Sequence, residues 1–201
     1  SFKITGSGSC IPSVVQNNDT FLNHSFYDES GSEFDIENQT IIEKFSSITG
    51  INQRKYISAN LTTSDIAYQA AKSAIKDADI DPETLDYIIL AHNFGDITCN
   101  SKQIDTLPSL ASRVKAKLKI KNPECIAYDV LFGCPGWIEG MIQAQAFIKA
   151  KMAQKCLVIG ADALSRVIDS HDRDSMIYAD GAGATVLEKS SQEGGILSHC
   201  T

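Results

Sequence analysis

The feature that most constrains the fold of this chain is a set of four short segments with the character of buried strands. They are Tyr87–Ala91, Cys125–Val130, Cys156–Gly160 and Ala182–Leu187. Tyr87–Ala91 is apolar throughout, as expected of a strand covered on both faces of its sheet. A further short strand is expected over Phe2–Ile11, and Gly194–Ser198 is a candidate to pair beside the last of the four.

Segments with helical periodicity lie between these strands. After Thr63, apolar residues recur at three- and four-residue spacing as far as Ile75, which predicts an amphipathic helix. A second helix is expected over about Pro108–Leu118, and a third begins just after Cys134. Residues 16–38 are polar and are assigned to loops and short helices. This alternation predicts an α/β layered domain with a mostly parallel sheet.

Composition excludes several classes of protein. Lys and Arg number 18 against 25 Asp and Glu, for a net charge of −7, which disfavours a nucleic-acid binder because such a protein must neutralise phosphates. The longest apolar runs are about six residues, too short to span a membrane, and no signal-peptide pattern is visible at the start. The six cysteines form no Cys-x-x-Cys pair, so free thiols in a reducing cytoplasm are expected rather than disulfides or zinc.

Several motif-like stretches fail on inspection. Gly6–Gly8 and Asp180–Ala184 each lack the third glycine of a dinucleotide-binding fingerprint, and there is no Walker A sequence. His171–Asp174 is interpreted as a solvated loop rather than a metal site. The basic run Arg113–Lys121 is interpreted as a solvated helix end and loop, where positive charge is favourable, with a patch for an anionic partner as the alternative.

The segment Asp129–Gly140 carries the clearest chemical signal. A buried strand ends at about Val130 and a helix begins just after Cys134, with glycines on both sides that permit a tight turn. Pro135 suits the first turn of a helix. A thiol at that position lies at the positive end of the helix dipole, which favours thiolate, and backbone amides there point to where an oxyanion would form. The residues alone leave two interpretations open, a nucleophilic cysteine and an inert buried one.

Taken together, the motifs resemble the β-ketoacyl-acyl carrier protein synthase III family of the thiolase-like superfamily. The resemblance spans nearly the whole chain and rests on ordered motifs at Ile4–Ser9, Thr49–Ile51 with Arg54, Pro108–Ser109, Asp129–Gly136, Gly160–Leu164, Asp169–Arg173 and Asp180–Ala184.

The resemblance implies a mechanism and a set of site residues. Cys134 would attack an acyl thioester on coenzyme A or acyl carrier protein, and a decarboxylated malonyl-carrier unit would then take the acyl group to give a 3-oxoacyl product. Arg173 would help to bind the coenzyme A end. Leu164 and Tyr178 align with walls of the acyl pocket, and Leu107 aligns with a residue that reaches the partner's pocket in a homodimer. No cofactor is implied.

The resemblance also implies an architecture, a five-layered α-β-α-β-α parent of which residues 1–201 supply the N-terminal α-β-α half. The family's His-Gln-Ala-Asn and Gly-Asn-Thr-Ser motifs, which supply a catalytic His and Asn, do not occur here. His199–Cys200 is expected to be structural, on a terminal strand. A lone half would expose the apolar face that packs on its twin. We therefore expect a missing C-terminal half or a second subunit, and expect this stretch alone to be inactive.

Other functions remain as alternatives. One is another thiolase-like condensing enzyme, such as a hydroxymethylglutaryl-CoA synthase or a specialised polyketide or aryl-lipid synthase. Another is a non-catalytic partner subunit, against which the presence of Cys134 argues. The family grips coenzyme A with an aromatic residue and an arginine, and this chain has Lys44 and Ile48 there, which leaves room for a carrier-bound acyl donor.

Overall fold

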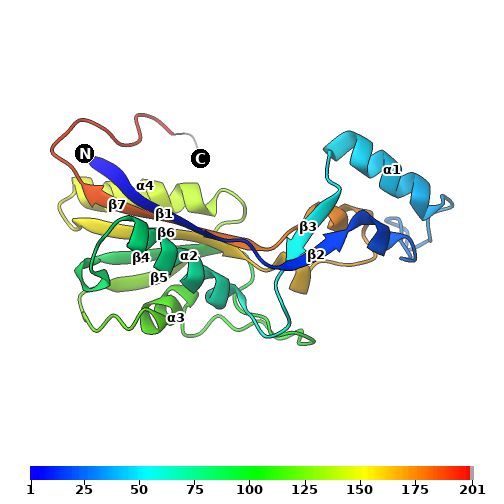
Figure 1. The fold of residues 1–201 in the computed structure, drawn as a ribbon, viewed down its shortest axis with the longest axis horizontal. Coiled ribbons are helices and arrows are strands. Elements are labelled where there is room, and N and C mark those ends of the chain that lie inside the picture. The colour runs from blue at the N-terminus through cyan, green and yellow to red at the C-terminus, as the bar shows by residue number, and fades with distance from the viewer. Residues whose placement is uncertain (200–201) are drawn as a thin grey trace.

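A five-stranded sheet forms the centre of the molecule and lies between helices on both faces (Figure 1). The computed structural model describes residues 1–199. The strands are β1 (Phe2–Cys10), β4 (Tyr87–His92), β5 (Ile126–Leu131), β6 (Lys155–Asp162) and β7 (Gly181–Lys189). Their order in the sheet is β1-β7-β6-β4-β5. The α/β fold class predicted from the sequence is therefore confirmed.

The sheet is mixed, which corrects the expectation of a mostly parallel one. β4 runs parallel to β5 and β6, whereas β7 runs antiparallel to β6 and β1. β7 follows β6 through two short 3₁₀ turns instead of a crossover helix, so the chain returns in the opposite direction. The expected strand at Gly194–Ser198 does not form, because β1 occupies the open edge of β7. His199 likewise lies outside any strand, and Cys200 is outside the described residues.

Helices cover both faces of the sheet and give three layers, α-β-α. On one face lie α2 (Thr63–Asp77) and α3 (Leu110–Lys117), and on the other lies α4 (Gly136–Lys149). Alternate residues of β4 enter the two cores, with Ile88 facing α2 and α3 and Ile89 facing α4. This double coverage explains the unbroken apolar run of β4. We call these three layers the layered body.

Glycines let α2 approach the edge strand β1 very closely. A Cβ atom added to Gly8 would lie 2.4 Å from the carbonyl oxygen of Ala70 and 2.4 Å from the backbone nitrogen of Ala74. Gly6 meets the same helix one turn further along. The side chains of α2 on this face are alanines, so the backbone of α2 packs almost directly on the backbone of β1.

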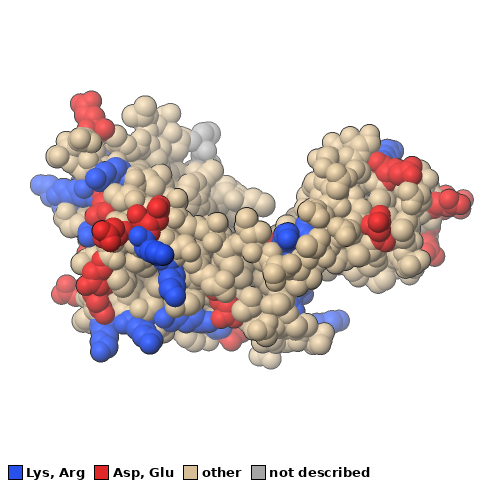
Figure 2. Space-filling view, in the orientation of Figure 1, with Lys and Arg blue, Asp and Glu red and all other residues tan. Residues whose placement is uncertain are grey.

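A smaller unit extends from one end of the layered body (Figure 1). It comprises residues 14–56 and 169–178, contains β2 (Val14–Asn17), α1 (Asn38–Thr49), β3 (Gln53–Tyr56) and the 3₁₀ turn η4 (Arg173–Ile177), and is called the peripheral lobe here. β2 and β3 form an antiparallel pair separate from the main sheet. A narrow waist joins the two units (Figure 2).

The basic run on and after α3 is partly neutralised within the fold. Its side chains gather along the edge of the layered body near α3 (Figure 2). Arg113 pairs with Asp96, and Lys117 with Asp65. Lys115 donates to the carbonyls that follow the helix. Most of this run therefore secures α3 and its neighbours. Within residues 1–199, no helix is both long and apolar enough to cross a bilayer.

Candidate functional site

Cys134 lies in the tight connection between β5 and α4. Gly133 adopts a φ of 59°, a left-handed conformation that a side chain would strain. A Cβ on Gly136 would lie 2.8 Å from the Cβ of Ala91 in β4, so only glycine allows α4 to start this close to the sheet. Both glycines that the sequence marked for a tight turn are therefore used as predicted.

The helix places its positive end beside the thiol. α4 begins at Gly136, and the carbonyl of Pro135 accepts the backbone N–H of Glu139 at 3.1 Å as the first bond of the helix. Cys134 is an exposed free cysteine one residue before Pro135. The elbow therefore has the strand, turn and helix that were predicted, and the thiol points outward instead of into the core.

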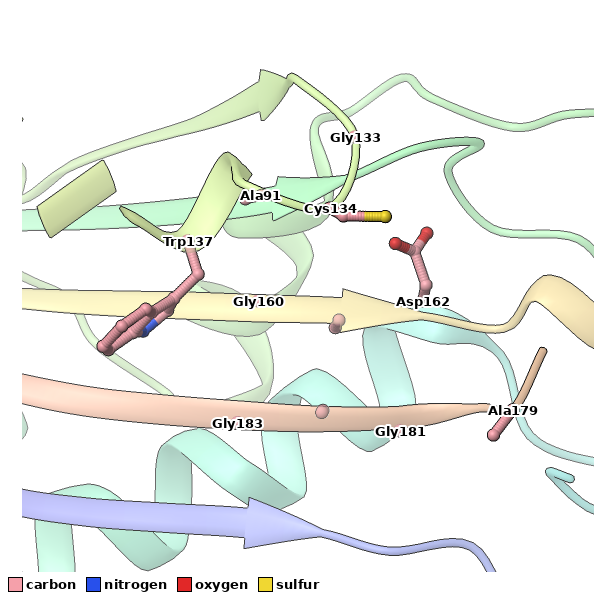
Figure 3. A pocket seen from close by; sticks show the side chains of 11 residues that line it. Ala91, Gly133, Cys134, Trp137, Gly160, Asp162, Ala179, Gly181 and Gly183 are labelled. Carbon is pink, nitrogen blue, oxygen red and sulfur yellow. The ribbon is translucent and has the colours of Figure 1, made fainter. Parts of the chain in front are cut away.

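The thiol borders a cavity of about 250 Å³ (Figure 3). The residues that line it are Ala91, Gly133, Cys134, Trp137, Gly160, Ala161, Asp162, Ala179, Gly181, Ala182 and Gly183. The cavity lies at the carboxyl ends of the parallel strands β4 and β6. The chain leaves β4 for β5 on one side and returns to β6 on the other. Ligands of open α/β sheets bind at such a switch point.

Small residues keep this cavity open. Glycines of β6 and β7 form its floor, and the indole of Trp137 lies along them (Figure 3). A Cβ on Gly160 would approach the Cβ of Trp137 to 3.2 Å. The indole N–H donates to Thr185 Oγ1 at 3.0 Å, which fixes the ring. The result is a rigid slot beside the thiol rather than a filled core.

One carboxylate, that of Asp162, projects into the cavity opposite the sulfur (Figure 3). Its oxygens accept the backbone N–H of Asn93 at 2.9 Å and the side-chain amide of Asn93 at 2.6 Å. Burial raises the pKa of the Asp162 carboxyl above its ordinary value, although both bonds from Asn93 oppose that shift. Asp162 is thus the titratable neighbour of Cys134 within the cavity lining.

The other predicted site residues lie outside the lining of this cavity. Leu164 and Tyr178 are close to it in sequence, and Tyr178 is 42% exposed. Leu107 is 84% exposed on the long loop before α3. Arg173 lies in the peripheral lobe, where its guanidinium stacks on the ring of Phe34 at 5.0 Å. The structure therefore brings Cys134 to a cavity and leaves the roles of these four residues as predictions.

Arg173 borders a second cavity, of about 360 Å³, between α1 and η4. Lys44 and Ile48 of α1 also line it, together with apolar side chains such as Phe45. Lys44 and Ile48, which the sequence analysis aligns with coenzyme A-gripping positions of the resembled family, thus lie with Arg173 around one cavity. His171 lies nearby with its ring against Tyr27, at 5.0 Å between ring centroids.

Sequence reasoning missed Asp162 and Asn93. Asp162 lies within Gly160–Leu164, one of the motifs that carry the resemblance, but the sequence analysis assigned it no role. The available signal was its place directly after a buried run, because the carboxyl ends of parallel strands meet at one edge of a sheet. Asn93 carried the same signal, because it stands two residues after the buried run Tyr87–Ala91, as Asp162 does after Cys156–Gly160.

No histidine lines the cavity within residues 1–199. The nearest along β4 is His92, which is buried and structural. Its Nδ1 accepts the backbone N–H of Gly95 at 2.9 Å, so the proton resides on Nε2, which donates to Asp129 at 3.0 Å. Asp129 also accepts backbone N–H groups from the first turn of α3. This bonding anchors α3 to β5.

Comparisons with known proteins agree on one group of enzymes. A sequence model of 3-oxoacyl-[acyl-carrier-protein (ACP)] synthase III matches residues 128–201. The chain is 38% identical over 197 residues to β-ketoacyl-[acyl-carrier-protein] synthase III 1 of Vibrio parahaemolyticus, covering 98% of this chain and 55% of that protein. It is 36% identical over 186 residues to the synthase III of Erythrobacter litoralis, covering 92% of this chain and 51% of that protein.

Solved structures give the same result. The crystal structure of 3-oxoacyl-[acyl-carrier-protein] synthase III from Aquifex aeolicus matches with a TM-score of 0.77 and 33% identity, covering 96% of this chain and 55% of that one. The chain spans about half the length of the curated relatives it matches.

Proposed function

We propose that this chain carries the acyl-accepting half of a condensing enzyme and that Cys134 is its nucleophile, because the chain belongs to the β-ketoacyl-[acyl-carrier-protein] synthase III family. The observation that carries this proposal is the exposed thiol at the N-terminal end of α4, facing a cavity lined by small residues. Members of the family with this name join an acyl group to a malonyl unit held on acyl carrier protein. We extend that activity to the protein of which this chain is a part.

The proposed first step is acyl transfer to the thiol. The sulfur of Cys134 attacks the thioester carbonyl, a new carbon–sulfur bond forms, and the donor leaves as a thiol that takes up the proton. The positive end of α4 stabilises the negative charge that develops during the attack. In the second step a malonyl unit loses carbon dioxide, and its carbanion attacks the acyl carbon and releases the sulfur. Neither step requires a resident metal or cofactor.

The proposal includes a partner for the layered body. Side chains on and around β5 and the start of α4 are apolar and 46–64% exposed, namely Ile126, Leu131, Phe132 and Ile138. β5 is also an edge strand of its sheet, with backbone groups free to pair. We propose that a second half of the same fold, supplying the His and Asn, and a second copy of the whole protein cover these surfaces. Coenzyme A or acyl carrier protein would deliver the acyl group past Arg173.

Intact mass spectrometry after incubation with a panel of acyl-CoAs tests the proposal. An acyl-sized mass increase that maps to Cys134, and that Cys134→Ser abolishes, is the expected result for the chain together with any polypeptide that co-purifies with it. Cys99→Ser is a matched control that should still acylate. A protein that takes up no acyl group from any coenzyme A or carrier donor contradicts the proposal.

Product analysis then separates this activity from its relatives. Carbon dioxide release from malonyl-carrier protein with formation of a 3-oxoacyl-carrier product is expected. Condensation with acetoacetyl-CoA and no decarboxylation would instead indicate a hydroxymethylglutaryl-CoA synthase type of reaction.

A further inference from the structure

The strongest unassigned feature near Cys134 is the carboxylate that shares its cavity. We propose that Asp162, held in place by Asn93, acts on the reaction through Cys134 by holding the thiol in its protonated, unreactive form while the carboxylate is ionised. The inference rests on the proposed role of Cys134 for its meaning in catalysis. Its test uses a reagent that needs no acyl donor, so the two proposals can fail separately.

Geometry places the carboxylate where it can act. Asp162 is the last residue of β6, and its side chain and the sulfur of Cys134 project into the same cavity of about 250 Å³ (Figure 3). In a space of this size a negative charge on the carboxylate disfavours a second negative charge on sulfur. A protonated carboxyl imposes no such repulsion.

Asn93 fixes the carboxylate in this orientation. Its two N–H groups bond both oxygens of Asp162 and tie the end of β6 to the end of β4. The side-chain oxygen of Asn93 would lie 3.6 Å from a Cβ atom added to Gly133, so Asn93 also lies near the loop that carries Cys134. The carboxylate is therefore fixed by Asn93 at the edge of the sheet next to the loop that carries the nucleophile.

The surroundings let Asp162 change its charge without a strong opposing partner. Of the titratable groups near it, Asp180 disfavours the ionised form of Asp162, whereas His92 would favour that form only when protonated on both ring nitrogens. Asp180 is engaged by the backbone N–H groups of Ile57 and Ser165, at 2.8 and 2.9 Å. His92 keeps Nδ1 as an acceptor from Gly95. Burial is the main influence, and it raises the pKa of Asp162.

Alkylation of Cys134 by iodoacetamide, followed across pH by peptide mass mapping, measures this coupling. Asp162→Asn keeps the size of the side chain and removes its charge. It is expected to speed alkylation of Cys134 near neutral pH by roughly threefold to tenfold. The ratio of variant to wild-type rates should fall toward one as the pH is lowered through the titration of Asp162.

Two further variants keep the inference open to refutation. Asn93→Ala removes one hydrogen-bond donor, which raises the pKa of Asp162, so its alkylation rate should fall between wild type and Asp162→Asn. Asp86→Asn is the matched control, because this carboxylate lies at the opposite end of β4 and accepts the N–H groups of Gln154 and Lys155. It should leave alkylation unchanged.

A rate in Asp162→Asn that equals or falls below wild type at every pH, in a variant whose circular dichroism matches wild type, overturns the inference. Faster alkylation together with no uptake of acyl groups would uphold it and defeat the proposed function.

Discussion

The layered body and the peripheral lobe are stabilised by different kinds of interaction. In the body, β4 and β6 are buried on both faces by aliphatic side chains, and the central residues of both strands have no exposed surface. The lobe has a much smaller core of Phe21, Phe26, Ile42 and Met176. Burial of apolar area therefore dominates the stability of the body, whereas the lobe depends more on specific polar bonds.

A buried arginine supplies several of the polar bonds that stabilise the lobe. Arg54 is 4% exposed, and its guanidinium lies over the rings of Phe21 and Phe45 at 5.2 and 5.9 Å. It donates to the carbonyl of Gln16 at 3.2 Å and to Asn18 Oδ1 at 2.6 Å. Burial lowers the pKa of Arg54 from its ordinary value. The lobe is thus assembled around one cation whose bonds reach back to β2 and the turn after it.

The largest expected effect is a loss of stability in the layered body, at the place where the backbone of α2 packs against the backbone of β1. Gly8→Ala places a methyl group 2.4 Å from the backbone of α2, so helix and strand must separate. We expect a loss of about 3 kcal/mol in the free energy of unfolding, or no folding at all. Urea unfolding followed by the fluorescence of Trp137, the single tryptophan of the chain, measures it.

Gly183→Ala is the matched control for this prediction. Gly183 lies in β7, paired with Ser9 of β1, and a Cβ there would meet no atom within 4 Å. Its free energy of unfolding should stay within about 0.5 kcal/mol of the wild-type value. Equal losses of unfolding free energy in both variants would show that the close approach of α2 is not the reason why β1 requires glycine at position 8.

The same contrast explains how much could be predicted from the sequence. The elements of the body can be predicted from local sequence, because buried strands such as Tyr87–Ala91 and the alanine-rich stripe of α2 have short-range patterns. The elbow at Cys134 was predictable for the same reason. In the lobe, β3 was not anticipated, since Arg54 finds its partners at positions 16 and 18 and Met176 comes from far along the chain. The helix α1 was also not anticipated, although its apolar residues between positions 41 and 48 follow helical spacing. The antiparallel place of β1 and the Asp162–Asn93 pair also depend on distant partners.

The second effect tests whether the lobe depends on its cation. Arg54→Lys keeps the charge but cannot reach both acceptors or stack as a planar group. We expect the lobe to lose about 2 kcal/mol, seen as faster hydrogen exchange across residues 14–56 with little change in the Trp137 unfolding midpoint. Lys44→Arg, an exposed substitution in α1, should leave exchange unchanged. Equal destabilisation of body and lobe in Arg54→Lys would mean that the two units unfold together.

The last effect comes from the buried thiol of the body and needs alkaline pH to appear. Cys156 has no exposed surface, and burial raises its pKa from 9.0 to about 12. Because the folded pKa is the higher one, stability is intact below pH 9 and declines as the pH rises from 9 toward 12, by roughly 1.4 kcal/mol per pH unit.

Cys156→Ala removes this ionisable group, so the alkaline loss of stability should become smaller. What remains is expected from Cys125, whose pKa burial also raises above 9.0, and from the Tyr128 hydroxyl. Burial raises the pKa of Tyr128 from 10.0 to about 12. Adding Tyr128→Phe to Cys156→Ala should flatten the alkaline decline further. Urea midpoints from Trp137 fluorescence between pH 8 and pH 11 supply the measurement. An alkaline slope as steep in the double variant as in wild type would show that Cys156 and Tyr128 are not the groups whose titration destabilises the body.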